Sequence, residues 1–428
     1  MFAVQDEFRR SRLAVVALFC TLGFQYATWA SRIPAIKAHL GLSAAQVGLL
    51  LMATGVGAAG SFPLVAMLMR RLGSRRLSLL SGLCLALLLL AMAELPNYPT
   101  ALAVMCADGV LVGALNVAMN AQGAALEVRF KRNTMATLHA TFSGGSLVAA
   151  LLASGMNLLT SSVLVHFAVA TGLLLAAVGF ARPGLLTQDK PAEADAEADT
   201  GAAAEAAAPK PRSRFTLPAR ITLWMGVAMA FGTVTEGAMN DWSSLYLKDV
   251  AKASAELAPM GIAVVSVTMV LARLLTDGWR ARWGDGRIVR TGSVLAGVGL
   301  ALALLSGGVV PALIGFACVG LGVAAVTPCV YVAAAAQGSD ALALVAAMGT
   351  VGLLGGPPVI GFIANADGLA WGMAAVAGCA LVVALCATRI RWAPAPEPAQ
   401  ERSEGQGEGR SEGQSADTRS TQVEAEAV

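Results

Sequence analysis

Residues 77–93 read LSLLSGLCLALLLLAMA, a run of 17 residues without one charged side chain. A helix needs about 20 predominantly apolar residues to cross the hydrocarbon core of a bilayer, so this run predicts a membrane-spanning helix over 77–94. Similar runs recur and give twelve candidate spans, at about 13–31, 44–69, 77–94, 100–126, 134–157, 160–181, 219–246, 257–278, 289–307, 310–337, 341–364 and 368–388. We therefore predict an all-α membrane protein with twelve transmembrane helices.

The composition fits a membrane protein better than a water-soluble one. Hydrophobic residues make up 56% of the 428 residues and charged residues only 13%, whereas soluble domains carry about 25% charged residues. The net charge of +3 gives no reason to expect nucleic acid as a partner. The sequence has no zinc, P-loop or dinucleotide-binding motif, so we expect neither a cofactor nor an enzyme. All seven cysteines lie inside apolar runs, so we expect no disulfides.

The basic residues are distributed unevenly between the two predicted ends of the helices. If the N-terminus is cytoplasmic, only four of the 30 Lys and Arg residues lie on the far side, namely Arg32, Lys37, Lys248 and Lys252. Positive charge is retained on the cytoplasmic side during insertion. We therefore predict a multi-pass protein of the cytoplasmic (inner) membrane with both termini in the cytoplasm, which requires an even number of spans.

A polar segment divides the spans into six and six. Residues 186–214 read LTQDKPAEADAEADTGAAAEAAAPKPRSR, which is too polar and too rich in Ala, Glu and Pro to bury a core. We predict four parts: a six-helix bundle at 1–185, a disordered cytoplasmic linker at 186–217, a second six-helix bundle at 218–390 and a disordered cytoplasmic tail at 391–428.

The two predicted bundles also resemble each other in sequence. Residues 112–116 (VGALN) have a counterpart at 319–323 (VGLGV), and basic turns follow both the second and the eighth span. These matches share an offset of roughly 207 to 211 residues, which indicates a parallel repeat. Two parallel six-helix halves with a solute site between them form one established plan for secondary transporters.

Several short motifs resemble the major facilitator superfamily, and within it the fucose-permease-like branch with its uncharacterised bacterial inner-membrane members. They are residues 29–34 (WASRIP), 42–48 (LSAAQVG), 119–123 (MNAQG), 138–143 (LHATFS) and 236–242 (EGAMNDW). The resemblance implies the major facilitator fold, alternating access, and a cavity lined by the first, fourth, seventh and tenth spans.

The sequence departs from this family at three positions that matter. The turn after the second span has Arg70 where the superfamily usually has Asp. The acidic positions that the sugar-transporting members use for coupling and substrate match Ala30 and Asn116 here. We therefore expect neither the usual proton-coupling pair nor transport of fucose itself.

Polar side chains within the apolar spans are the candidates for solute binding, because such groups are costly in hydrocarbon and need an explanation. On a helical wheel Asn116 and Asn120 share one face of the fourth span, and Gln25 and Trp29 share one face of the first. Asn240 in the seventh span joins them. The alternatives are hydrogen bonds between helices for the amides and an interface anchor for Trp29.

Titratable residues provide candidates for coupling and gating. Glu236 is the candidate proton-coupling carboxylate, with a structural ion pair across the bundle, for example with Arg32, as the alternative. His139 is a second candidate, against a structural histidine.

Arg273 and Asp277 are candidate gate residues at the inner end of the eighth span. They can pair with each other or across to the other half, and simple positive-inside anchoring is the alternative. We expect Asp241 and Trp242 to mark the outer membrane interface.

The sequence as a whole predicts a secondary active transporter. We expect a monomer that moves a small polar, sugar-like solute across the bilayer, with proton symport as the coupling hypothesis. An exporter of amphipathic drugs or metabolites is the main alternative. A membrane sensor or scaffold that does not transport is the alternative from another class.

Overall fold

The computed structural model describes residues 2–132, 134–187 and 220–392, without the side chains of residues 2–5, 136 and 277. The predicted linker and tail fall almost entirely outside the described residues. Within them, the regular elements are all helices: α1 (Phe2–Ala30), α2 (Ile33–Leu40), α3 (Ala44–Gly60), α4 (Phe62–Ala93), α5 (Tyr98–Phe130), α6 (Met135–Leu159), α7 (Val163–Ala181), α8 (Arg220–Asp249), α9 (Met260–Trp283), α10 (Asp285–Ser306), α11 (Val309–Val323), α12 (Val326–Ala335), α13 (Ser339–Asp367) and α14 (Leu369–Ala387).

The helices have the length and composition of membrane spans, which confirms the predicted fold class. Among the described residues, nine helical segments are long and apolar enough to cross a bilayer, or ten if α2 and α3, bent by 120°, form one span. α8 and the shorter apolar part of α9 do not meet that standard, because α8 carries several polar residues and α9 has only Met260–Thr276 as an apolar stretch. The count of twelve therefore stays a prediction.

The predicted span 44–69 is divided in the structure. α3 ends at Gly60, Ser61 Oγ donates to the carbonyl of Ala58 at 2.7 Å, and α4 begins with Pro63 in its first turn. Gly73 then adopts φ 73° and ψ 165° inside α4. Glycine is favoured at this positive φ because it has no Cβ. The helix is interrupted there, so the run that begins at residue 77 lies on a new helical segment.

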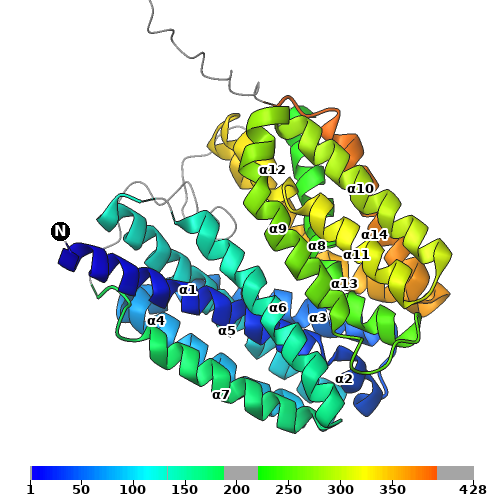
Figure 1. Cartoon of the computed structure of the whole chain (residues 1–428), viewed down its shortest axis with the longest axis horizontal. Coiled ribbons are helices and arrows are strands. Elements are labelled where there is room, and N and C mark those ends of the chain that lie inside the picture. The colour runs from blue at the N-terminus through cyan, green and yellow to red at the C-terminus, as the bar shows by residue number, and fades with distance from the viewer. Residues whose placement is uncertain (1, 133, 188–219, 393–428) are drawn as a thin grey trace, which may run out of the picture. The chain divides into compact units, whose positions relative to one another are not determined.

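The helices pack in two sets, which we call the first helix set (α1–α7) and the second helix set (α8–α14). In the first set α1 packs against α5, α6 and α7, while α5 also packs against α3 and α4. In the second set α8 packs against α13 and α14, and α10 against α11 and α14. The sets meet where α3 packs on α13, α6 on α9 and α2 on α8 (Figure 1). The boundaries predicted for two separate bundles remain a prediction.

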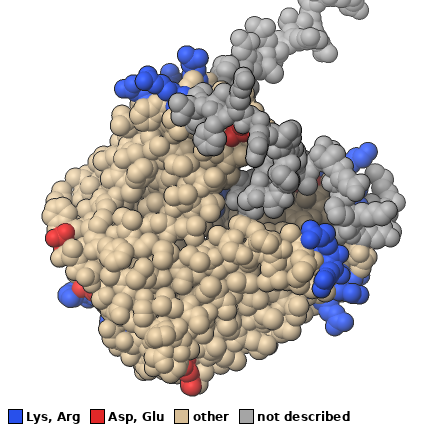
Figure 2. Space-filling model, turned by 180° about the vertical axis from the view of Figure 1, so that it is seen from behind, with Lys and Arg blue, Asp and Glu red and all other residues tan. Residues whose placement is uncertain are grey.

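The helices have two ends, which we name for orientation. α7 ends and α8 begins at the linker end, and the α2 end is the opposite one. Large apolar side chains are exposed on many helices, for example Leu305 and Val351. Lys and Arg gather in groups at the top and right of the view in Figure 2, whereas most of this face carries no charge. An extended apolar exterior of this kind marks a surface that contacts lipid.

A close contact between α3 and α13 brings the two sets together at the α2 end. A Cβ built on Gly48 would lie 2.6 Å from the carbonyl oxygen of Pro357 and 3.0 Å from Pro358 Cα. Gly361 on α13 approaches α3 in the same way, because a Cβ built on it would lie 2.8 Å from the carbonyl oxygen of Ala44. Small residues allow membrane helices to approach to backbone contact. Gly60, nearer the linker end of α3, has open space beside it.

Candidate functional site

Three helices from both sets meet at the side chain of Arg273 on α9. Its Nη2 donates to Glu236 Oε1 on α8 at 2.9 Å, and its Nη1 donates to Ser143 Oγ on α6 at 3.0 Å. The two charged side chains are 26% and 28% exposed, so the ion pair is partly accessible. The structure thus places a predicted gate residue and the predicted coupling carboxylate in direct contact. The side chain of Asp277 lies outside the described residues.

The predicted amides are arranged in two places. Asn240 lies one turn beyond Glu236 on α8, and its Nδ2 donates to the carbonyl of Glu236 at 3.2 Å. On α5, Asn120 Nδ2 donates to Asn116 Oδ1 at 2.6 Å and to the Asn116 carbonyl at 2.9 Å. Asn116 is exposed and Asn120 half-buried. These hydrogen bonds stay within one helix and use only part of each amide. Each asparagine therefore keeps donor or acceptor sites for another partner.

A second polar cluster lies nearer the α2 end. Tyr26 on α1 donates its hydroxyl to Asp241 Oδ1 on α8, which joins the two helix sets. Its neighbour Gln25 is fully buried and donates from Nε2 to Asp108 Oδ1 on α5 at 2.8 Å. Gln25, predicted to contact the solute, is thus held by a carboxylate within its own set.

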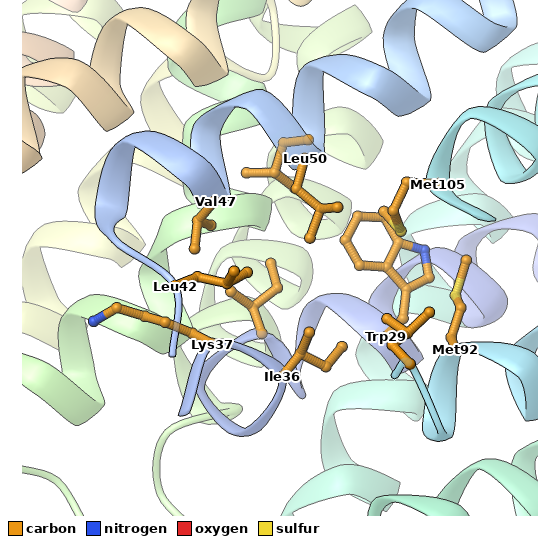
Figure 3. A pocket seen from close by; sticks show the side chains of 11 residues that line it. Trp29, Ile36, Lys37, Leu42, Val47, Leu50, Met92 and Met105 are labelled. Atoms are coloured by element: carbon orange, nitrogen blue, oxygen red, sulfur yellow. The ribbon is translucent and has the colours of Figure 1, made fainter. Parts of the chain in front are cut away.

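Trp29 is also packed within the first helix set. It is 2% exposed and lies against Met92, Met105 and Leu50, around a cavity of about 10 Å³ (Figure 3). A volume of this size holds about one water molecule at most. In this conformation the indole ring therefore faces apolar side chains and has no room beside it for a solute.

The two membrane histidines have different surroundings. His139 on α6 is exposed and lies edge-to-face on Phe19, with ring centroids 5.1 Å apart. His166 on α7 is buried, and its Nδ1 accepts a hydrogen bond from Arg32 Nε at 3.0 Å. Arg32 is therefore not the partner of Glu236, contrary to the pairing that the sequence suggested as one alternative.

The expectation that Asp241 and Trp242 mark the membrane interface is wrong. Trp242 is 0% exposed and Asp241 only 5% exposed, so both lie inside the helix packing. The sequence analysis also gave no role to Asp108, Tyr26 or Ser143. An aspartate within the apolar run 100–126 is itself a signal, because a carboxyl group in hydrocarbon is rare and usually functional.

Further polar contacts show that the helix sets are closed against each other at the α2 end. Besides the Tyr26 bond, Lys37 on α2 pairs with Asp249 on α8 at 2.5 Å. Near the end of α6, Ser154 and Asn157 donate to the carbonyl oxygens of Glu256 and Ala255, at 2.5 and 2.7 Å. Together with the α3–α13 contact, these bonds hold α2, α3 and α6 of the first set against the second set.

Long apolar helices in two packed sets, with polar side chains joining the sets, define a multi-pass membrane protein. The sequence model of the Major Facilitator Superfamily matches residues 14–339, and the chain belongs to this superfamily. It is therefore a transporter and not an enzyme.

Relatives and solved structures agree with this assignment. The chain is 31% identical over 384 residues to an uncharacterized MFS-type transporter of Yersinia pestis, covering 87% of this chain and 94% of the relative. The fold is similar to the crystal structure of the nucleoside transporter NupG, with a TM-score of 0.64, 14% identity, and coverage of 90% of this chain and 98% of that one. It is also similar to FucP in the outward conformation, with a TM-score of 0.55, 17% identity, and coverage of 89% and 99%.

Proposed function

We propose that the chain is a secondary active transporter that moves a small polar solute across the cytoplasmic membrane by alternating access, in symport with protons. The observation that carries this proposal is the junction at Arg273. Its guanidinium group bonds to Glu236 within the second helix set and to Ser143 of the first helix set. A charged junction between two helix sets can bind a polar solute. Its hydrogen bonds also change when the two sets move relative to each other.

The chemistry of the junction favours a hydroxylated or amide-bearing solute over an amphipathic drug. Arg273 offers several N–H donors, Glu236 offers acceptors, and Asn240 offers both. An exporter of amphipathic drugs would need an open, mostly apolar site, whereas Trp29 is packed against methionines and leucines in this conformation. The partly exposed ion pair therefore supports a polar cargo.

Proton coupling follows from competition for Arg273. While Glu236 is ionised, it satisfies the guanidinium group. A solute oxygen that takes over a bond to Arg273 leaves the Glu236 carboxylate without its counter-charge, and a carboxylate in that position favours binding a proton. Solute and proton then enter the junction together, which is the condition for symport.

The direction in which this conformation faces follows from the basic residues. The linker end receives most Lys and Arg residues, so by the positive-inside rule it is cytoplasmic. The contacts at the α2 end therefore close the outer side, and the conformation faces inward. Alternation requires those contacts to break and others to form at the linker end.

The proposal is tested in proteoliposomes with sugars, polyols, nucleosides, amino acids and amphipathic drugs as candidate solutes. We expect an inward-directed proton gradient to drive accumulation of a polar solute. Glu236→Gln is expected to abolish the response to the gradient, whereas Glu94→Gln, the same change at an exposed position at the α2 end, leaves it unchanged. Uptake that ignores the proton gradient, or coupled uptake that survives Glu236→Gln, would contradict proton symport through Glu236. Failure of every solute to move would favour a sensor or scaffold.

A further inference from the structure

Gln25 on α1 and Asp108 on α5 form a polar pair inside the first helix set. Both side chains are fully buried, and Gln25 Nε2 donates to Asp108 Oδ1 at 2.8 Å. The other oxygen of each side chain, Gln25 Oε1 and Asp108 Oδ2, has no hydrogen-bond partner among the described residues. Buried polar atoms nearly always have a partner. An ionised Asp108 would leave both of these oxygens as unsatisfied acceptors.

The charge of Asp108 is also uncompensated. Within the described part of the chain, Asp108 makes no ion pair. The helices that pack against α5 are α1, α3, α4 and α6. α3 has no titratable residue, and the charged residues and histidine of the other three lie toward their linker ends. They are Asp6, Glu7, Arg9, Arg10 and Arg12 on α1, Arg70, Arg71, Arg75 and Arg76 on α4, and His139 on α6.

The remaining titratable neighbours cannot neutralise the carboxylate. They are the thiols Cys20 of α1, Cys84 of α4 and Cys106 of α5, and the phenols Tyr98 of α5 and Tyr26 of α1; Glu127 and Arg129 of α5 lie at its linker end. Tyr26 lies within electrostatic reach of Asp108, Asp241 and Glu236. None of these thiols and phenols is a cation. Burial of an unpaired carboxylate away from water is strongly disfavoured, and the neutral acid is the form that such a site accommodates.

We propose that Asp108 holds the coupling proton in this conformation, while Glu236 stays ionised in its pair with Arg273, and that Asp108 does so in a reciprocal acid–amide pair with Gln25. A proton on Oδ2 makes that oxygen a donor, and it then donates to Gln25 Oε1 while Gln25 Nε2 keeps its bond to Oδ1. One proton thus satisfies both remaining oxygens and removes the unpaired charge. The coupling role rests on the proposed proton symport, whereas the protonation of Asp108 in this conformation does not.

The position of Gln25 connects this proton to the closed α2 end. The next residue, Tyr26, donates to Asp241 and so joins α1 to α8. If Asp108 loses its proton, an unpaired negative charge enters the surroundings of Tyr26, where Glu236 is already ionised in its pair with Arg273. Like charges in a desolvated site repel, which favours separation of α1 from α8. Proton release and opening of the α2 end are thereby linked.

Infrared spectroscopy of the purified protein at neutral pH tests the protonation directly. We expect a carbonyl band of a protonated carboxylic acid that disappears in Asp108→Asn and persists in Asp249→Asn, the same change at a carboxylate that is 37% exposed. Asn can reproduce both bonds to Gln25, so this variant is expected to fold and to melt as the wild type does. Gln25→Met keeps the acid but removes its partner, so the band should remain and shift. A spectrum in which Asp108→Asn removes an ionised carboxylate band, or leaves the acid region unchanged, would overturn the proposal.

Transport separates this inference from the proposed function. Asp108→Asn is expected to exchange solute across proteoliposomes at equal pH but to lose accumulation driven by a proton gradient. If this variant accumulates solute as the wild type does, the coupling role of Asp108 is wrong. If the wild type itself ignores the gradient, proton symport fails and the coupling role fails with it, while the infrared band still decides whether Asp108 holds a proton.

Discussion

Replacement of Gly48 by alanine should open the α2 end of the transporter. The added Cβ would lie 2.6 Å from the carbonyl oxygen of Pro357, and ordinary contacts begin at 3.4 Å. The neighbouring atoms are backbone atoms of α13, including Pro358 Cα at 3.0 Å and Gly361 Cα at 3.1 Å. Backbone cannot rotate away as a side chain can, so α3 and α13 must separate.

The energetic effect can be bounded from this overlap. An extra methyl group in a well-packed contact costs about 1–3 kcal/mol. Because the contact between α3 and α13 closes the α2 end, that cost applies to the conformation described here and not to one in which the two helices have separated. A difference of about 1–3 kcal/mol changes the ratio of two conformations by about 5- to 150-fold. We expect Gly48→Ala to shift the population toward the outward-open conformation by a factor in that range.

The shift can be measured with spin labels on His39 of α2 and Lys252 after α8, which are both exposed at the α2 end. The seven native cysteines are replaced beforehand, and distances are recorded by pulsed electron resonance. Gly48→Ala should move the distance distribution toward longer values. Gly60→Ala on α3 and Gly355→Ala on α13 are matched controls, since a Cβ at either position meets open space, and both should leave the distribution as in the wild type.

The reasoning is refuted if Gly48→Ala gives the wild-type distance distribution. It is also refuted if Gly60→Ala shifts the distribution equally, because the effect would then reflect helix propensity rather than the contact with α13. A fall in thermal stability without a change in distance would mean that α13 adjusts locally and that the contact does not control closure.

Three further predictions concern other contacts. Tyr26→Phe removes the hydrogen bond to Asp241, worth about 0.5–1.5 kcal/mol, and should lengthen the spin-label distances as Gly48→Ala does. Lys37→Met removes the ion pair with Asp249, whose side chains are 27% and 37% exposed; such pairs contribute about 0–1 kcal/mol, so a smaller shift that salt weakens further is expected. Gln122→Leu removes a fully buried amide that bonds to α4 and to the chain after α7, and a stability loss of about 1–3 kcal/mol should appear as a lower melting temperature without a change in distance.

The fold class was predictable because the bilayer leaves few options. A chain in hydrocarbon must satisfy its backbone hydrogen bonds internally, which in a sequence of long apolar runs means helices. The local breaks were less predictable. The run 44–69 reads as one span by hydropathy, but α3 ends at Gly60 and α4 begins after Ser61, and the non-helical Gly73 separates this run from the one that begins at residue 77. Hydropathy averages over about 20 residues and does not register a single positive φ.

The pairings in the site could not be predicted from spacing. Asp277 is one turn from Arg273 in sequence, and spacing alone left open whether Arg273 pairs locally or across to the other half. The structure gives Arg273 a partner 37 positions away, Glu236, and another on a different helix set, Ser143. The packing of whole helices decides which of them lie side by side. In the sequence, the only indication of this arrangement is the weak similarity between its two halves. Arg32, which the sequence offered as one alternative partner of Glu236, instead donates to His166, because it lies after the end of α1 at Ala30 and beside α7.

The contacts of two adjacent residues, Gln25 and Tyr26, suggest an order of events. Gln25 points to Asp108 within the first helix set, and Tyr26 points to Asp241 in the second. Because both side chains leave the same turn of α1, α1 cannot move away from α8 without changing the surroundings of the Asp108 pair as well. A protonated Asp108 adds no charge near Tyr26 and leaves the bond to Asp241 undisturbed. Proton loss should therefore weaken the closed α2 end before solute exchange, and a transporter with Asp108→Asn should cycle with its solute but without its proton.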